Sequence, residues 1–365
     1  MFITSNLMVF YFCWEFMLVP AYFIIGGWGH KNSYHAAFKF FVFTHAGAAS
    51  ILLGIGATYL LTGTLDMFKA RDLLSTSPKD ELYWIFIAYL IGFLVKMAIV
   101  PFHTWLPDTY AEAPIPMAAI MSGVITEAGA YGILRIPFSM ILPSISNLSA
   151  ISHILFFISA LGVISALYGA AIAIVENDMR RILAYSSISQ MGYVLFGLSL
   201  YPFFEGLIGA IFHLVTHGIS KGLLFLCIGS IIRQTNTADI RQTGGLAKNL
   251  PFTAISTAIS VFSIAGIPPL ACFMSEFLIF AGGFTASSLK ISYYITTNIM
   301  LIATLFSLAY ALRIFCRIFL GVQRVNCLGE APLTMILSML FLAIMVIVMG
   351  IWPDPVIKLI SHNVL

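Results

Sequence analysis

Ionisable side chains stand inside long apolar stretches of this 365-residue chain, where a charge is costly and where it can carry a proton. Glu15 lies in FCWEFMLVP, Lys96 in GFLVKMAIVP, Glu127 in GVITEAGAYG and Glu276 in CFMSEFLIF. A charge in mid-membrane costs at least about 2.5–3.5 kcal/mol on insertion scales, so such a residue usually faces the bundle interior and has a function. These four residues are candidates for a proton pathway.

Three further candidates share one helix. His213, His217 and Lys221 are spaced i, i+4 and i+8 in HLVTHGISKG, which places them in a row on one helix face. Histidine titrates near neutral pH, and a buried lysine responds strongly to the charges beside it. A proton relay fits this row better than a metal site, because no third ligand is nearby and the lysine would repel a cation. A set of static buried ion pairs is the structural alternative.

Composition places these residues in a membrane. Hydrophobic residues make up 60% of the chain and charged residues only 9%, with a mean hydropathy of +0.98, whereas a soluble domain carries about 25% charged residues. The net charge of +3 does not favour nucleic acid as a partner. We expect no cofactor and no metal in this chain, because it has no GxGxxG or Walker A pattern and no CxxC spacing. The five cysteines stand singly, at Cys13, Cys227, Cys272, Cys316 and Cys327.

The elements that must position the candidates are predicted to be about ten transmembrane helices of an all-α, polytopic helical bundle. A hydrocarbon core of about 30 Å needs roughly 20 apolar residues per helix. Stretches of this kind run over residues 2–26, 37–62, 82–104, 115–140, 151–175, 183–200, 205–232, 251–283, 292–320 and 333–352.

Two of these stretches interrupt their own helix. The third passes from Lys96 into Pro101, and the eighth holds Gly266-Ile267-Pro268-Pro269 in mid-span. Proline removes a backbone donor and clashes with the preceding turn. Paired broken helices, one in each half of a chain, indicate inverted repeats and an ion pathway. A plain proline kink in each helix is the simpler alternative.

Basic residues are slightly more frequent in the odd-numbered connections between the stretches. This weak bias predicts that the odd connections lie in the cytoplasm and both termini outside. The odd connections hold Lys31, Arg180, Arg181, Arg233, Arg241, Lys248, Arg317 and Arg324, and the other basic residues counted are Lys69, Arg71, Lys79, Arg135, Lys290 and Lys358.

Sequence segments that follow one another along nearly the whole chain carry a specific pattern. They are WEFMLVPAYFIIGGWG, KMAIVPFHTWLPDTYAEAPIP, SGVITEAGAYGILRI, NDMRRILAYSSISQMGYVLFGL, HLVTHGISKGLLFL and GGLAKNLPFTAISTAISVFSIAGIPPLACFMSEFLIF. They resemble the antiporter-like membrane subunits of respiratory complex I, whose superfamily includes Mrp-type sodium/proton antiporters and energy-converting hydrogenases. The pattern is most similar to the M-type, or subunit-4-like, subunit of NADH-quinone oxidoreductase.

The resemblance implies roles for individual residues. Glu15 matches the glutamate that pairs with Lys96, the lysine of the first broken helix. His217 matches the histidine of a later channel helix, and Lys221 matches the central lysine found there. Glu276 matches the charged residue of the second broken helix, which joins the exit half-channel.

Two candidates depart from the common pattern. Glu127 stands where many relatives carry a lysine or histidine, so the usual order of proton transfer along the axis is in doubt. His213 matches a histidine that only some members have. The resemblance still implies that both belong to the polar axis.

The function implied by the resemblance is proton translocation in an energy-transducing membrane. The chain would be a subunit of a redox-driven oxidoreductase, with other membrane subunits as partners and with the electron donor and acceptor bound elsewhere. A sodium/proton antiporter subunit, an antiporter-like subunit of a membrane-bound hydrogenase and a non-transporting structural subunit are the alternatives.

The resemblance also predicts how the chain is divided. Relatives of this type usually begin four helices earlier, so we expect an incomplete first repeat over residues 1–140. A second repeat should cover 141–320, followed by a C-terminal helix and tail over 321–365. Another chain or an upstream segment should cover the flank around 2–62, where the small residues of THAGAASILLGIGATYLL suit close helix packing; lipid is expected as the other partner.

Overall fold

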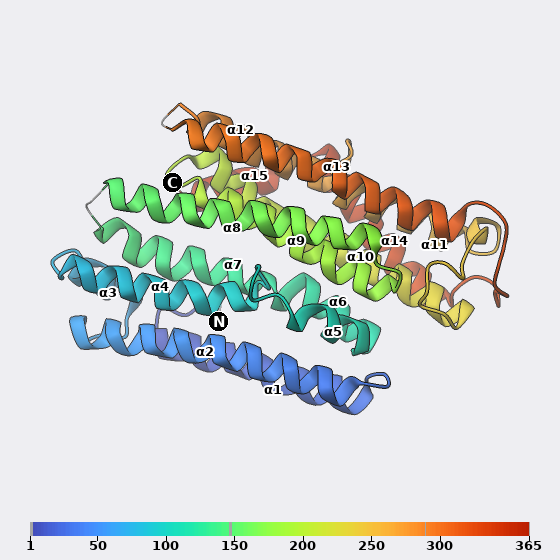
Figure 1. Ribbon diagram of the computed structural model, residues 1–365, viewed down its shortest axis with the longest axis horizontal. Helices are drawn as coiled ribbons and strands as arrows, with labels where there is room; N and C mark the ends of the chain where they lie inside the picture. The colour runs from blue at the N-terminus through green and yellow to red at the C-terminus, as the bar shows by residue number, and fades with distance from the viewer. Residues whose placement is uncertain (1–2, 146–147, 289, 365) are drawn as a thin grey trace. The chain divides into compact units, whose positions relative to one another are not determined.

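The computed structural model describes residues 3–145, 148–288 and 290–364, and helices make up most of them (Figure 1). Within these ranges the backbone forms no β-strand, only isolated bridges. The predicted all-α class is therefore confirmed. The chain divides into two compact units, Met1–Met117 with Ile125–Leu155, and Ala118–Val124 with Phe156–Leu365. The predicted division into repeats stays a prediction.

The first unit contains a long helix pair and a broken helix. Polar caps set the helix starts: Asn6 accepts hydrogen bonds from the first backbone N–H groups of the first helix, and Asp66 does the same for a short third helix. The two caps also face each other in an antiparallel bridge. The helices are α1 (Leu7–Trp28), α2 (Ser33–Thr62), α3 (Met67–Leu74), α4 (Lys79–Lys96) and α5 (Trp105–Glu112).

Small residues of α2 pack against α4 rather than away from the unit. A Cβ atom at Gly47 would press on Val95, and one at Gly54 would press on the ring of Tyr89. On the facing helix, a side chain at Gly92 would collide with Ile51. Close approach of α2 and α4 therefore already uses Gly47 and Gly54, and the predicted cover of this flank by another chain or segment stays a prediction.

The predicted span 115–140 is one helical run with irregular winding. It passes through α6 (Ile115–Ile120), the π-helical η1 (Met121–Ile125), α7 (Glu127–Ile133), the π-helical η2 (Leu134–Ile141) and the short 3₁₀ helix η3 (Leu142–Ser144). π-Helical turns are rare and often occur at functional sites. Glu127 thus begins a short α-helical segment between two such turns.

The second unit holds most of the next helix and all the helices that follow it. Gly162 and Gly192 let two of them, α8 and α9, approach closely, since a Cβ atom on either residue would collide with the backbone of the other helix. The helices are α8 (Leu148–Val175), α9 (Met179–Ser199), α10 (Phe204–Thr235), η4 (Leu246–Lys248), α11 (Pro251–Ile264), α12 (Ala271–Ala286), α13 (Ile291–Phe319), α14 (Leu333–Ile351) and α15 (Asp354–Val364).

Seven helical segments in the described residues are long and apolar enough to cross a membrane. They are Leu7–Trp28, Ser33–Thr62, Ile115–Ser144, Ile151–Val175, Phe204–Thr235, Ile291–Phe319 and Leu333–Ile351. The predicted stretch 183–200 is a single helix, α9, and the stretches 82–104 and 251–283 each contain a break. The polytopic class holds, whereas the count of ten spans stays a prediction. Two helices, α3 and α15, lie between or beyond the predicted apolar stretches and are not among them.

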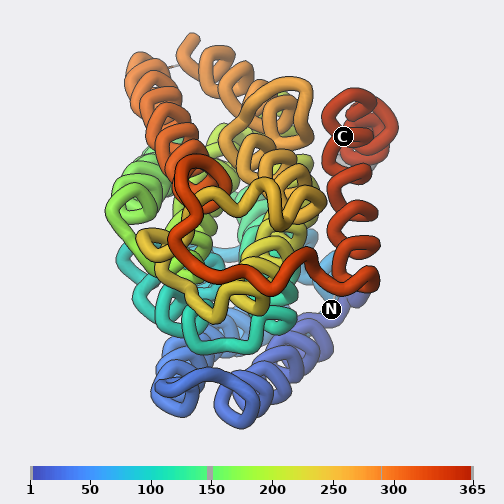
Figure 2. Tube along the Cα trace, turned by 90° about the vertical axis from the view of Figure 1, so that its right-hand side faces the viewer, coloured from blue at the N-terminus to red at the C-terminus, as the bar shows by residue number. Residues whose placement is uncertain are grey.

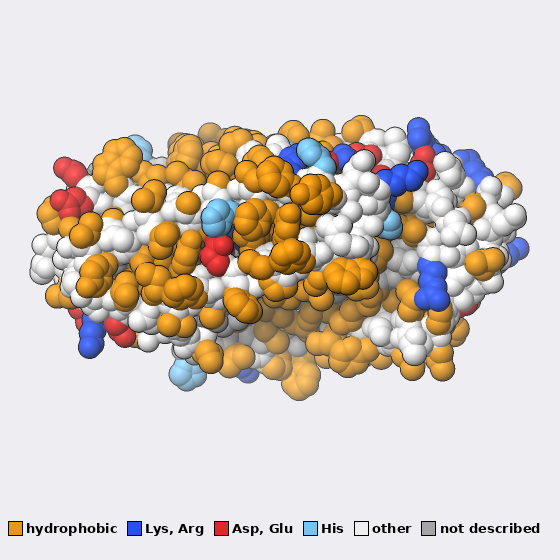
Figure 3. Space-filling model, turned by 90° about the horizontal axis from the view of Figure 1, so that it is seen from below, with side chains coloured by type: hydrophobic (Ala, Val, Ile, Leu, Met, Phe, Trp, Pro, Cys, Tyr) orange, Lys and Arg blue, Asp and Glu red, His pale blue; other side chains and the backbone are white. Residues whose placement is uncertain are grey.

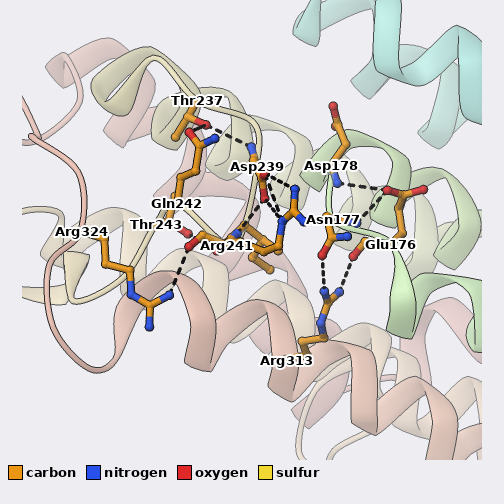
Figure 4. A network of polar contacts seen from close by, with 11 residues as sticks. Glu176, Asn177, Asp178, Thr237, Asp239, Arg241, Gln242, Thr243, Arg313 and Arg324 are labelled. Carbon is orange, nitrogen blue, oxygen red and sulfur yellow. Dashed lines mark hydrogen bonds and ion pairs between the residues drawn. The ribbon is translucent and has the colours of Figure 1, made fainter.

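Three connections of the second unit meet at one end of it, where the yellow and red segments run together in Figure 2. Asp178, the N-cap of α9, forms an antiparallel bridge with Asp239. Arg324 donates a hydrogen bond of 3.2 Å to the backbone oxygen of Arg241 (Figure 4). The odd connections around 176–182, 233–250 and 321–332 therefore lie on the same side of this unit, as the predicted alternation of spans requires.

Charged pairs stabilise this end. Arg241 donates from Nε to Oδ1 of Asp239 at 3.0 Å and from Nη2 to Oδ2 at 2.7 Å. These side-chain hydrogen bonds lower the pKa of Asp239 below its ordinary value, and burial only partly opposes them. The pair therefore stabilises the loop fully at pH values above the ordinary carboxyl pKa. That contribution is lost as the pH falls through the lowered pKa of Asp239.

Arg313 connects α13 by hydrogen bonds to the turn between α8 and α9 (Figure 4). Its guanidinium donates to the backbone oxygen of Glu176 and, at 3.0 Å, to Oδ1 of Asn177. We expect Arg313→Ala to destabilise the protein by about 1.5–3 kcal/mol, since hydrogen bonds from charged groups contribute about that much. Thermal unfolding of the purified protein measures the loss. Arg317→Ala, on the exposed side of the same helix, is the control, and equal effects of the two substitutions would contradict this role.

Candidate functional site

The first helix break comes directly after Lys96, as predicted. Lys96 is the last residue of α4, the backbone then turns through Ala98 with φ of 55°, and α5 begins at Trp105. The carbonyl oxygen of Val95 accepts hydrogen bonds from Ala98 N at 3.1 Å and from Trp105 Nε1 at 3.0 Å. In a membrane a freed carbonyl needs such partners, and this one is satisfied.

Lys96 sits among aromatic rings. Its side chain is only 2% exposed, and Nζ lies 5.2 Å from the ring centroid of Trp14 and 6.0 Å from that of Phe40. Cation–π attraction contributes about 2 kcal/mol or more when the cation is desolvated. The rings of Trp14 and Phe93 pack edge to face, with their centroids 5.2 Å apart. A buried cation held largely by rings is sensitive to any charge that approaches it.

Glu15 has a direct partner that the sequence analysis does not include. Its Oε2 lies 3.2 Å from Nδ1 of His45 on α2. The carboxylate of Glu15 also acts on Lys96 through space. The coupling of Glu15 with Lys96 stays a prediction. In the sequence, the signal for His45 is a titratable residue within the apolar stretch 37–62.

A second charged pair holds α5 to α2. Lys39 Nζ lies 2.7 Å from Oδ2 of Asp108, and Oε2 of Glu112 accepts a hydrogen bond of 3.0 Å from the backbone N of Asn32, just before α2 begins. These contacts fix the segment that follows the first break. They position the break rather than form part of the candidate relay.

The second helix break also lies where it is predicted. α11 ends at Ile264, Gly266 adopts φ of 67°, and α12 begins at Ala271. The carbonyl oxygen of Ile264 accepts a hydrogen bond of 3.1 Å from Nε2 of Gln190 on α9. At this break a side chain from a neighbouring helix therefore donates the hydrogen bond to the freed carbonyl oxygen. At the first break the donor, Trp105, belongs to the broken helix itself.

Glu276 lies against this break. The side chain is 4% exposed, and its carboxylate is so close to Gly266 that a Cβ atom there would collide with it. Oε1 is buried and has no hydrogen-bond partner in the described part of the chain. A buried acid without a partner is costly when ionised, so its charge responds to small changes in its surroundings.

The predicted row on α10 is buried, and each of its members is within the second unit. His213 Nδ1 lies 2.9 Å from Ser275 Oγ, and His213 Nε2 lies 2.8 Å from Oε1 of Gln190. The rings of His213 and His217 are stacked with centroids 5.9 Å apart. Lys221 Nζ donates to the carbonyl oxygen of Leu183 at 2.8 Å and to the hydroxyl of Ser186.

Gln190 links this row to the helix break, and sequence reasoning misses it. It is fully buried and contacts both His213 and the carbonyl of Ile264. The signal for it is the run SSISQ inside an otherwise apolar stretch of α9. Polar side chains there must find partners in the bundle.

Glu127 belongs to the first unit with Lys96, and it is partly buried. The row of His213, His217 and Lys221 belongs with Glu276 to the second unit. The candidates therefore divide between the two units. The predicted place of Glu127 between Lys96 and the row stays a prediction.

Comparison with known proteins places this arrangement in a family. A family described as "NADH:quinone oxidoreductase/Mrp antiporter, TM" matches residues 4–306. NADH-quinone oxidoreductase subunit M of Rickettsia conorii is 32% identical, over 100% of this chain and 72% of its own. F(420)H(2) dehydrogenase subunit M of Methanosarcina mazei is 33% identical, over 99% of this chain and 72% of its own.

Solved structures agree with these relatives. Respiratory complex I from Thermus thermophilus contains a chain that is 26% identical, with a TM-score of 0.84 over 99% of this chain and 76% of that one. The Mrp complex from Dietzia sp. supports the fold, with a TM-score of 0.88 at 23% identity over 99% of this chain and 74% of that one. Because the family match covers most of the chain, this protein belongs to the transmembrane family of NADH:quinone oxidoreductase and Mrp antiporter subunits.

Proposed function

We propose that this chain is a proton-translocating, antiporter-like subunit of a complex I-type oxidoreductase, in an energy-transducing membrane. The observation that carries the proposal is that a buried ionisable side chain lies at each helix break: Lys96 ends α4, and Glu276 lies against Gly266. Relatives named NADH-quinone oxidoreductase subunit M and F(420)H(2) dehydrogenase subunit M support it. Electron transfer would take place in partner subunits.

Charge separation at Glu15 would begin the cycle. While Glu15 is ionised, its field favours the charged form of Lys96; when Glu15 is protonated or displaced, Lys96 loses that support and releases its proton. Removing one partner of a buried charge costs about 3–5 kcal/mol. Moving one charge against 100 mV costs about 2.3 kcal/mol, so one such event is sufficient for one proton.

The resemblance implies the remaining order of transfer. The proton would pass from Lys96 toward Glu127, then to His217 and Lys221, and would leave by way of Glu276. In the second unit, His213 and Gln190 connect the row on α10 to the backbone at the break. These contacts support the row on α10 as a part of the second broken helix's surroundings, and the route of the proton to Glu276 rests on the resemblance.

Protons fit the site better than sodium ions do. A sodium site needs several clustered oxygen ligands, as hard cations do generally, whereas Glu15 is beside a histidine and near a lysine. The intact complex in proteoliposomes should take up protons on addition of an electron donor, at a rate that does not depend on sodium. Sodium-dependent proton exchange without any donor would instead favour the antiporter alternative.

We also propose that another membrane subunit covers the flank formed by α1. Phe12, Phe16 and Phe23 are 65%, 79% and 61% exposed along that helix. A shallow pocket of about 320 Å³ on this helix is lined by Phe12, Cys13, Phe16 and Met17. Large apolar side chains suit both lipid and helix packing, and the relatives and solved complexes, which have several membrane subunits, favour a protein partner for part of this face.

A further inference from the structure

The second helix break frees a backbone carbonyl oxygen, and a side chain occupies it. In a continuous α-helix the carbonyl of Ile264 would accept a hydrogen bond from the N–H group four residues later. That residue is Pro268, which has no N–H group. Gln190 on α9 donates from Nε2 to this oxygen at 3.1 Å instead. Because a carbonyl oxygen can only accept, this contact fixes which end of the Gln190 amide faces the break.

The other end of the amide faces His213. Oε1 of Gln190 lies 2.8 Å from Nε2 of His213, and an amide oxygen is an acceptor only. His213 must therefore be the donor, so Nε2 carries a hydrogen whether the ring is neutral or charged. The plane of the ring is held by stacking on Tyr193 of α9 and on His217, with centroids 6.2 and 5.9 Å away.

Nδ1 is then the nitrogen at which His213 gains and loses a proton. It lies 2.9 Å from Oγ of Ser275 on α12, the residue before Glu276. In the neutral ring Nδ1 is an acceptor, so the Ser275 hydroxyl donates to it. When Nδ1 is protonated, the hydroxyl accepts from it and can turn its own hydrogen to the carbonyl oxygen of Cys272 at 2.8 Å or to Oγ1 of Thr216 at 3.2 Å. Ser275 therefore has a hydrogen-bond partner in both states of the ring.

Surface water does not compete for these contacts. The side chains of Gln190, His213 and Ser275 are all fully buried. Figure 3 shows hydrophobic side chains over much of one face of the protein, as a lipid-facing surface requires. Inside such a bundle, buried polar groups depend on one another for hydrogen bonds. The direction set at the Ile264 carbonyl is therefore passed along the chain of contacts as far as Ser275.

We propose that Gln190 is a positioning residue, which holds His213 in its Nε2–H form and confines its proton exchange to Nδ1, beside Ser275. The backbone of the broken helix and the protonation site of a relay histidine are then coupled through one amide. A proton taken up at Nδ1 gives the imidazolium, and its loss from Nδ1 restores the neutral ring, while the hydrogen on Nε2 stays in place. The use of this exchange in translocation rests on the proposed function, whereas the form of the ring does not.

The form of the ring can be measured without transport. In the purified complex labelled with ¹⁵N-histidine, protonated and unprotonated ring nitrogens give separate NMR signals, and those of His213 are the ones missing from His213→Phe. At alkaline pH, where the ring is neutral, we expect a protonated Nε2 and an unprotonated Nδ1. Gln190→Met removes the acceptor at Nε2, so it should shift the neutral ring towards the Nδ1–H form, for which Ser275 is still an acceptor.

Either of two results would overturn the proposal. One is a protonated Nδ1 in the neutral ring of the wild-type protein, which tests the assignment even where Gln190→Met does not assemble. The other is a Gln190→Met complex that assembles and keeps the wild-type His213 signals. Gln234→Met is the matched control, because Gln234 is a buried glutamine of α10 that also donates to a backbone oxygen, that of Glu330 at 3.4 Å. It should leave the His213 signals unchanged.

Transport by the same variants tests the use of the coupling. We expect Gln190→Met to slow donor-driven proton uptake by the intact complex in proteoliposomes about 10- to 100-fold relative to Gln234→Met, because positioned proton transfer contributes about 10²–10⁴-fold. Equal rates for these two variants would refute the role of Gln190 in translocation. Lys96→Met, measured in parallel, tests the proposed function separately: if that variant is slow and Gln190→Met is not, only the positioning role fails.

Discussion

Lys96→Met should abolish most proton translocation by the complex that contains this chain. Methionine fills a similar volume between Trp14 and Phe40 but carries no proton and no charge. The field of Glu15 would then act on nothing that can release a proton. We expect the number of protons translocated per electron to fall to a small fraction of the wild-type value, measured with a donor in proteoliposomes.

Lys69→Met provides the control for this experiment. Lys69 is exposed on α3 in the same unit, so the same change of side chain there leaves the interior unaltered. A Lys96→Met complex that assembles normally and keeps the wild-type proton-to-electron ratio would rule out the assigned role. It would also favour the alternative in which this chain is a non-transporting structural subunit.

Gly266→Ala should damage the second half of the pathway through the backbone. A residue with a Cβ atom pays about 1–2 kcal/mol at the left-handed conformation of Gly266. The added methyl group would also collide with the carboxylate of Glu276 and displace it. Because a misplacement of about 1 Å can cost about 10²-fold in rate, we expect proton translocation to fall far more than stability does.

Gly63→Ala separates the two effects. Gly63 ends α2 with φ of 68°, almost the same as Gly266, and nothing lies within 4 Å of a Cβ atom added there. It should therefore show the loss of stability without the loss of translocation. If Gly63→Ala and Gly266→Ala impair translocation equally, contact between Gly266 and Glu276 has no functional role. Thermal unfolding and proton uptake of both variants are the measurements.

The breaks and the row on α10 could be predicted from sequence because each depends on local chemistry. Pro101 and the Gly266–Pro269 segment disrupt the helices that contain them through local backbone chemistry. The i, i+4, i+8 spacing places three side chains on one face of α10. The fold class follows from apolar length in the same way. These features need no knowledge of which helix lies beside which.

The partners of the candidates could not be predicted in this way. Gln190 and His45 are polar residues within apolar stretches, and their importance depends on contacts with other helices. The small residues of α2 show the same limit: their spacing indicates a close contact, but only the packed unit shows that α4 makes it. The π-helical turns beside Glu127 have no simple residue signature either.

The hydrogen-bonded carbonyl oxygens at the two helix breaks affect the rate at which the protein can change conformation during proton transfer. Trp105 donates a hydrogen bond to the carbonyl oxygen of Val95, and Gln190 donates one to that of Ile264. The backbone at each break is therefore held in place. If the backbone stays in place, gating is left to side-chain rotation and to the rearrangement of hydrogen bonds. Collective helix motions take microseconds to milliseconds, and gating by side chains alone would not require one at these breaks. The slow step of a turnover would then arise outside these breaks, in the event that delivers the signal to Glu15.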